Sequence, residues 1–206
     1  MLYETTRILA EQSYQHWITN EVFSFGWFVT MGVLATIYAT WFALVDKSRL
    51  SHLLLLGSLS AVGFVIGELT LIQLLGVAEY KVRPLPFIPP LFIVSVTKAP
   101  ILFMLVAQYT TSWKNYVLWA GIGAAALAFG LYPLYSSIGI FQLHNWNYFY
   151  QFLYMFTNGI IARTLFLMII TIEQSQTASK RVQEYGILQP AATKPLPEDQ
   201  NNTDNQ

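Results

Sequence analysis

The sequence has no cysteine and few charged residues. Without cysteine, disulfide bonds, thiolate catalysis and cysteine-ligated metal sites are excluded. Charged residues make up 11% of the 206-residue chain, whereas soluble domains carry about 25%. So little charge cannot cover a water-exposed surface of this size. The composition therefore favours a protein whose surface faces lipid.

Other absences narrow the functional classes. The three histidines, His16, His52 and His144, lie far apart in the sequence, so we expect no metal site. The net charge is zero and no block of basic residues is present, so nucleic acid is not an expected partner. The sequence signatures of zinc proteases, serine hydrolases and phosphate-binding loops are missing. We therefore expect a non-enzymatic protein without a cofactor.

Hydrophobic residues are abundant, and they are grouped. They form 54% of the chain, in runs of about the 20 residues that a helix needs to cross a bilayer. Five runs fit this length: residues 23–44, 50–75, 90–109, 113–134 and 148–172. The sequence therefore predicts an all-α polytopic membrane protein, a bundle of five transmembrane helices within residues 23–172.

The two ends of the chain differ from this middle part. Residues 1–22 are too polar to span, and their apolar positions fit an interfacial helix, with a partly ordered extended segment as the alternative. Residues 173–206 turn polar. Their first part, to about Tyr185, is expected to prolong the last helix, and the final stretch has too few bulky apolar residues to fold. We expect a largely disordered tail.

Basic residues outside the runs predict the orientation. One side carries three of them and the other side six, and the richer side should be cytoplasmic. The sequence therefore predicts a multipass cell-membrane protein with its N-terminus outside and its C-terminus in the cytoplasm. The basic residues counted are Arg7, Lys81 and Arg83 on one side, and Lys47, Arg49, Lys114, Lys180, Arg181 and Lys194 on the other.

Three ionisable residues, Glu68, Lys98 and Arg163, lie inside the predicted spans. Each costs about 2.5–3.5 kcal/mol at a helix centre, so such side chains usually face the bundle interior and find partners. At a rise of about 1.5 Å per residue, Glu68 and Lys98 reach similar depths from the same side. Glu68 is therefore the expected counter-ion of Lys98. Arg163 lies nearer the cytoplasmic face, within reach of that interface by snorkelling.

Polar neighbours give this cluster two interpretations. Asn158 is near the level of the predicted pair, and Ser95 precedes Pro100, whose missing N–H favours a kink. In the first interpretation the Glu68–Lys98 pair fixes helix packing. In the second, Glu68, Lys98 and Asn158 line a transporter or an ion or proton pathway. We favour packing, because the spans hold no second acidic residue to complete a relay.

Small residues predict close helix contacts. Gly63 and Gly67 form a G-x-x-x-G motif, which lets a partner helix approach closely. We expect this contact within the chain, with a homodimer as the alternative. The expected partners are the lipid bilayer and, as alternatives, another membrane protein or a second copy of the chain.

Scattered motifs resemble one family. They are H-W at 16–17, W-F-A-L-V-D-K-S-R-L at 41–50, Q-Y-T-T-S-W-K-N-Y at 108–116 and G-I-F-Q-L-H-N-W-N-Y at 139–148. The chain resembles, over residues 13–172, an uncharacterised family of small multipass membrane proteins from endospore-forming Gram-positive bacteria. The resemblance implies a bacterial membrane protein of about five helices, without an established activity. In that pattern acids often stand at Ser95 and Tyr132, Glu68 keeps its acid, and Lys98 does not belong.

From these observations we expect an accessory or structural membrane protein. Its mechanism would be helix packing and contact with another membrane component. A small transporter or ion pathway is the alternative, and an intramembrane enzyme comes third because no constellation of catalytic residues supports it.

Overall fold

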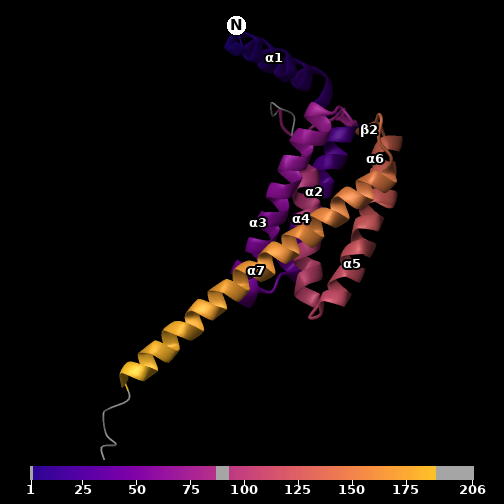
Figure 1. Ribbon diagram of the computed structural model, residues 1–206. Coiled ribbons are helices and arrows are strands. Elements are labelled where there is room, and N and C mark those ends of the chain that lie inside the picture. Colours follow the sequence, from indigo (N-terminus) through magenta and orange to yellow (C-terminus); the bar gives the residue numbers. More distant parts are fainter. Residues whose placement is uncertain (1, 87–92, 189–206) are drawn as a thin grey trace, which may run out of the picture. The chain divides into compact units, whose positions relative to one another are not determined.

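The computed structural model describes residues 2–86 and 93–188, and this part is mostly helical (Figure 1). The predicted helical class is therefore confirmed. The chain divides into two compact units, residues 1–166 and residues 167–206. The features discussed below belong to the first unit.

Helices account for nearly all of the regular structure in this unit. The α-helices are α1 (Leu2–His16), α2 (Phe25–Leu44), α3 (Leu50–Gly67), α4 (Ile93–Tyr109), α5 (Trp113–Ala126), α6 (Tyr132–Ser137) and α7 (Tyr148–Leu188), the last continuing into the second unit. The short 3-10 turn η2 (Lys47–Arg49) precedes α3. The π-helical segments are η1 (Trp17–Glu21), η3 (Glu68–Leu74) and η4 (Leu127–Leu131).

Within the described residues, four helical segments are long and apolar enough to cross a membrane. They are Phe25–Leu44, Lys47–Ile72, Trp113–Ser137 and Tyr148–Gln176, and they coincide with four of the five predicted runs. The remaining run, 90–109, contains the 17-residue helix α4. Residues 87–92 lie outside the described part, so the fifth span stays a prediction.

Helix α4 provides the centre of the hydrophobic core. It packs against α3, α2 and α5 (Figure 1). Ala99 and Phe103, four residues apart on one helical face, are both completely buried. Phe103 lies against Gly159 of α7, where any Cβ would collide with the phenyl ring. The small residue on α7 is therefore what allows the large side chain of α4 into the core.

The G-x-x-x-G motif of α3 lies against α7 of the same chain. A Cβ at Gly63 would overlap the amide of Asn158, and a Cβ at Gly67 would overlap the ring and hydroxyl of Tyr154. Side chains of α7 therefore occupy the space that a Cβ would take at each of these two glycines. The close approach expected from this motif occurs here within one chain.

Two short strands, which the sequence analysis did not anticipate, join distant connections. β1 (Ala78–Tyr80) pairs antiparallel with β2 (Phe141–Leu143), with Tyr80 opposite Phe141. Gly76 and Gly139, which precede the strands, have positive φ angles of 59° and 74°. Glycine adopts this left-handed conformation without the steric penalty of other residues. The strands thereby tie the connection after η3 to the connection between α6 and α7.

The ends of the chain agree in part with expectation. Residues 2–16 form the exposed helix α1, the helical one of the two alternatives considered for the N-terminal segment. Helix α7 runs to Leu188, close to the expected end of the prolonged last helix. The predicted disordered tail falls on residues 189–206, outside the described residues.

Asp46, in the turn between α2 and η2, organises the start of the second span. Its carboxylate accepts hydrogen bonds from Ser48 Oγ at 2.6 Å, Ser48 N at 3.0 Å and Arg49 Nε at 2.8 Å. The Ser48 hydroxyl, together with Arg49 and the Ser48 amide, lowers the pKa of Asp46 from 3.8 to about 2. Each of these donors favours the charged form of the carboxyl group.

We therefore expect the Asp46 turn to be intact above about pH 4 and to be lost only as the pH falls through about 2. A depressed pKa contributes stability when the group is charged, and this contribution disappears on protonation. The carboxyl carbon shift of labelled Asp46 should titrate near pH 2 in the parent. In Ser48→Ala the midpoint should move up toward the ordinary value, and an unchanged midpoint would contradict the assigned cause.

A methyl group at Gly67 should destabilise the contact with α7. Overpacking of this kind usually costs about 1–3 kcal/mol, because the Tyr154 ring cannot bend away as a flexible chain would. We expect Gly67→Ala to lower the melting temperature in detergent. Gly32→Ala is the matched control, since nothing lies within 4 Å of its added Cβ. Equal melting of both variants would show that α7 does not pack here.

Candidate functional site

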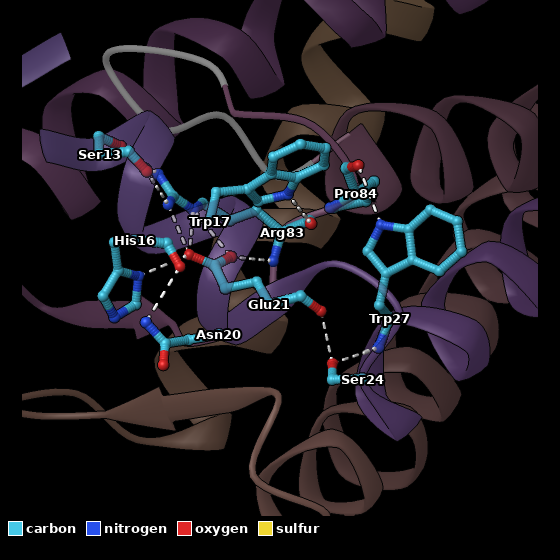
Figure 2. Close-up of polar contacts among 9 residues, drawn as sticks. All are labelled: Ser13, His16, Trp17, Asn20, Glu21, Ser24, Trp27, Arg83 and Pro84. Atoms are coloured by element: carbon cyan, nitrogen blue, oxygen red, sulfur yellow. Dashed lines mark hydrogen bonds and ion pairs between the residues drawn. The ribbon is translucent and has the colours of Figure 1, made fainter. Parts of the chain in front are cut away.

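A buried ion pair joins the N-terminal segment to the connection after β1 (Figure 2). Glu21, at the end of η1, is 2% exposed, and Arg83 is 6% exposed. Arg83 Nε lies 3.1 Å from Oε1 and 3.0 Å from Oε2 of Glu21, and Nη2 lies 2.5 Å from Oε1. The backbone N–H of Arg83 also donates to Oε2, at 2.7 Å. We call this contact the Glu21–Arg83 clamp.

Side chains of α1 complete the clamp. Arg83 Nη1 donates to Ser13 Oγ at 2.9 Å, and His16 Nδ1 lies 3.2 Å from Glu21 Oε1. The Glu21 carboxylate therefore contacts the guanidinium group of Arg83 and lies beside the Nδ1 atom of His16. Charge-assisted, bidentate contacts of this kind are among the strongest hydrogen bonds in proteins.

Two indole groups bond to the backbone of the connection that carries Arg83 (Figure 2). Trp17 Nε1 donates to the carbonyl of Arg83 at 2.9 Å, and Trp27 Nε1 donates to the carbonyl of Pro84 at 3.2 Å. Trp17 lies in η1 and Trp27 in the first turn of α2. The start of the first span is thus bonded to a segment that follows the second span.

The sequence analysis did not identify this clamp. It treated Arg83 only as a loop charge and placed Glu21 in a polar N-terminal segment. The sequence offers one weak sign of a buried acid: Glu21, in the sequence N-E-V-F, stands directly before the first apolar run. Nothing in the residue pattern connects that acid to an arginine 62 positions later.

Inside the bundle, Glu68 is held by a tyrosine of strand β1. Glu68 is 3% exposed and opens η3. The Tyr80 hydroxyl donates to Glu68 Oε1 at 2.9 Å. The strand β1 therefore delivers a donor to the acid at the end of α3. Tyr80 was not among the predicted site residues.

Lys98 contacts aromatic rings. It is 3% exposed, and its Nζ lies 3.8 Å from the ring centre of Tyr132 and 5.4 Å from that of Tyr135. Nζ has no hydrogen-bond partner among the described residues, so Lys98 does not bond directly to Glu68. The Glu68 carboxylate acts on it by longer-range electrostatic attraction. The negative ring face attracts the ammonium group as well.

The other predicted residues form separate contacts. Asn158 is hydrogen bonded to Ser60 across α3 and α7 at 2.9 Å, and its amide lies against Gly63, about 7.5 Å along α3 from Glu68. The guanidinium carbon of Arg163 lies 5.0 Å from the ring centre of Tyr116. The structure therefore brings Glu68 and Lys98 into one buried region and leaves Asn158 and Arg163 outside it. The side chain of Ser95 lies outside the described part.

The π-helical segments lie next to the buried charges. In the described chain, η1 ends at Glu21, η3 begins at Glu68, and η4 ends directly before Tyr132, whose ring lies under Lys98. One extra residue per turn rotates the side chains that follow, and such segments often occur at functional sites. Here each segment aims a charged or aromatic side chain into a contact between elements.

The space around Glu68 is small. An enclosed cavity of about 10 Å³ is bordered by Glu68, Tyr80, Gln151 and Tyr154. This volume is about what one water molecule needs. Within residues 2–86 and 93–188, no group of three or more histidine, aspartate or glutamate side chains is placed to bind a metal. The arrangement can hold a proton or a water molecule.

Comparison with protein-family models, with curated proteins and with solved structures finds no match.

Breaking the clamp should release the N-terminal segment. Removing one partner of a buried ion pair leaves a buried charge and costs about 3–5 kcal/mol. We expect Glu21→Gln and Arg83→Met each to speed amide hydrogen exchange in residues 13–24, and the double variant to cost less than the sum of both. Glu11→Gln, on the exposed face of α1, is the control. Parent-like exchange in both single variants would contradict this role.

Proposed function

We propose that the protein is a non-enzymatic integral membrane protein of accessory or structural type, in a bacterial cell membrane. It would cross the bilayer five times, with its N-terminus outside and its C-terminus in the cytoplasm. Its buried polar groups would fix the packing of the helices, and its lipid-facing surface would contact other membrane components.

The pairing of β1 with β2 supports five spans. β1 and β2 pair directly, so residues 78–80 and 141–143 lie on one side of the membrane. The chain must then cross an even number of times between them. Trp113–Ser137 is one apolar segment of sufficient length in this interval. Helix α4, with its buried core face, supplies the second crossing.

The observation that carries the packing role is the way the buried charges are used. Glu68 is bonded to Tyr80 of β1, and Lys98 of α4 lies on Tyr132 of α6. The first contact joins the consecutive elements η3 and β1, and the second joins α4 to α6 across α5 and η4. Charged groups are expensive in a membrane and persist where they have partners or a function. Here the partners come from different elements, as a packing role requires.

A proton pathway is the second candidate, and one observation favours it. Glu68 begins a π-helical segment and borders a cavity with room for about one water, beside Gln151 and Tyr154. A carboxylate with an adjacent water is able to exchange a proton. The pathway would need this small cavity to open on both sides of the membrane.

Variants of the two charges should separate these functions. We expect Glu68→Leu and Lys98→Leu each to reduce folded yield and melting temperature, because each leaves one buried charge without its opposite. The double variant should recover part of the loss. Tyr132→Leu, which removes the ring under Lys98, should also lower the melting temperature.

Parent-like folding of all three charge variants would contradict the packing role. Proton flux into liposomes that contain the purified parent, and its loss in Glu68→Gln, would establish the pathway instead. The double variant provides the control for leakage caused by misfolding.

A further inference from the structure

The guanidinium group of Arg163, on α7, lies against two aromatic rings near one end of the bundle. Its central carbon is 5.0 Å from the ring centre of Tyr116 and 5.4 Å from that of Phe166. Both distances fall within the range of about 6 Å in which an aromatic ring attracts a cation. The rings therefore stabilise the positive charge of Arg163, but they offer no oxygen atom to its N–H donors.

These donors are unused within the described chain. The Nε of Arg163 is buried and has no hydrogen-bond partner among the described residues. Its Nη atoms are not buried in this way, and no hydrogen bond or ion pair joins them to the described residues, so they can be reached from outside. An arginine side chain keeps its charge at any pH at which proteins work. Such a charge within an apolar helix calls for an anionic partner.

The depth of Arg163 follows from the residues that it contacts. Tyr116 lies in the first turn of α5, and the ring of Phe166 lies 6.3 Å from that of His52, in the first turn of α3. At about 1.5 Å per residue, both contacts are about one turn inside the end at which α3 and α5 begin. Trp113, at the start of α5, stacks on Tyr116. Aromatic side chains at helix ends mark the headgroup level of a bilayer.

Positive charge is in excess at this end of the described chain. Asp46 is the acid there, and it is already bonded to a neighbouring arginine at 2.8 Å. The basic residues at this end are Lys47, Arg49, Lys114 and Arg163. A group of basic residues beside the ends of apolar helices attracts anionic lipids.

The surroundings of the guanidinium group favour a phospholipid over a dissolved anion. On the side toward the middle of the bundle, Leu118, Trp119 and Ile161 are each more than half exposed. On the side toward the helix ends lies the exposed Lys114. Arg163 thus stands at the border between an apolar outer surface and a basic one. A ligand that matches both has hydrocarbon chains directly beside a phosphate group.

We propose that Arg163 binds the phosphate group of an anionic phospholipid. The two Nη groups donate to phosphate oxygens, since the planar guanidinium matches their spacing. The rings of Tyr116 and Phe166 hold the guanidinium group in place, and the hydrocarbon chains lie along the outer surface of α5 and α7. With the orientation proposed above, this lipid belongs to the cytoplasmic leaflet. The binding itself depends neither on that orientation nor on the packing role of Glu68 and Lys98.

Arginine side-chain NMR tests this contact in the parent protein. The full-length chain, with isotopically labelled nitrogen in its arginine side chains, is purified in a neutral detergent and titrated with phosphatidylglycerol. We expect the Arg163 signals, assigned by their loss in Arg163→Lys, to shift and to saturate. The signals of Arg49 should move less, because this arginine at the same end is already paired with Asp46. Phosphatidylcholine or inorganic phosphate at the same concentration should cause little change.

Other outcomes of the titration would overturn the proposal. Arg163 signals that do not respond to phosphatidylglycerol, or that move no more than those of Arg49, would show a guanidinium group that is only hydrated. An equal response to inorganic phosphate would show a site for a dissolved anion. An equal response to phosphatidylcholine would show that an anionic lipid is not required.

Native mass spectrometry of variants measures the affinity. We expect Arg163→Gln to weaken the binding of phosphatidylglycerol about five-fold, the contribution of one basic residue near an anionic lipid. Arg163→Lys keeps the charge without the planar fork and should lose less. Lys81→Gln, in the connection after β1, is the control and should bind like the parent. Equal binding by Arg163→Gln and this control would contradict the proposal.

These assays are independent of the packing role. They report the binding of a lipid, whereas the variants of Glu68 and Lys98 report folding. Failure of the lipid site would therefore leave the packing role standing, and failure of the packing role would leave the lipid site.

Discussion

A polar group buried among apolar helices must find its partners within the protein, and this constraint explains the contacts of Glu68, Lys98 and Asn158. Glu68 takes a tyrosine hydroxyl from a strand, Lys98 takes the face of a tyrosine ring, and Asn158 takes a serine from the neighbouring helix. The aromatic residues are therefore more than apolar filling. They let the bundle hold charged groups at depth without pairing each one with an opposite charge at contact distance.

Hydropathy and motif reading predicted the features that depend on local sequence. Runs of apolar residues gave four spans that the structure describes with similar bounds, because the length requirement is strict. Glu68 and Lys98 are both buried, but the direct pair that their similar depths predicted is not formed. Depth does not determine rotation about the helix axis, however. Sequence alone could not show that Lys98 faces Tyr132.

The remaining features arise from residues that meet only after folding. The strands are three residues each, too short for a period-two pattern to be recognised. Glu21 belongs to a segment that was expected to be an interfacial helix or a partly ordered extended chain, and Arg83 was expected to be a loop charge. The π-helical segments have no sequence signal that we could use, and yet two of them end at or directly before Glu21 and Tyr132, and the third begins at Glu68.

The Glu21–Arg83 clamp has a consequence for biosynthesis. Its two residues bracket α2 and α3, so Arg83 becomes available only after both helices have left the ribosome. Until then Glu21 lacks the guanidinium group of Arg83 as its partner, and the N-terminal segment is not bonded to the connection after β1. Closing the clamp requires both ends of this helix pair on one side of the bilayer. With α2 and α3 crossing the bilayer as proposed, a chain with its first helix inverted could not form this bond, so the clamp would distinguish the two insertions of that helix.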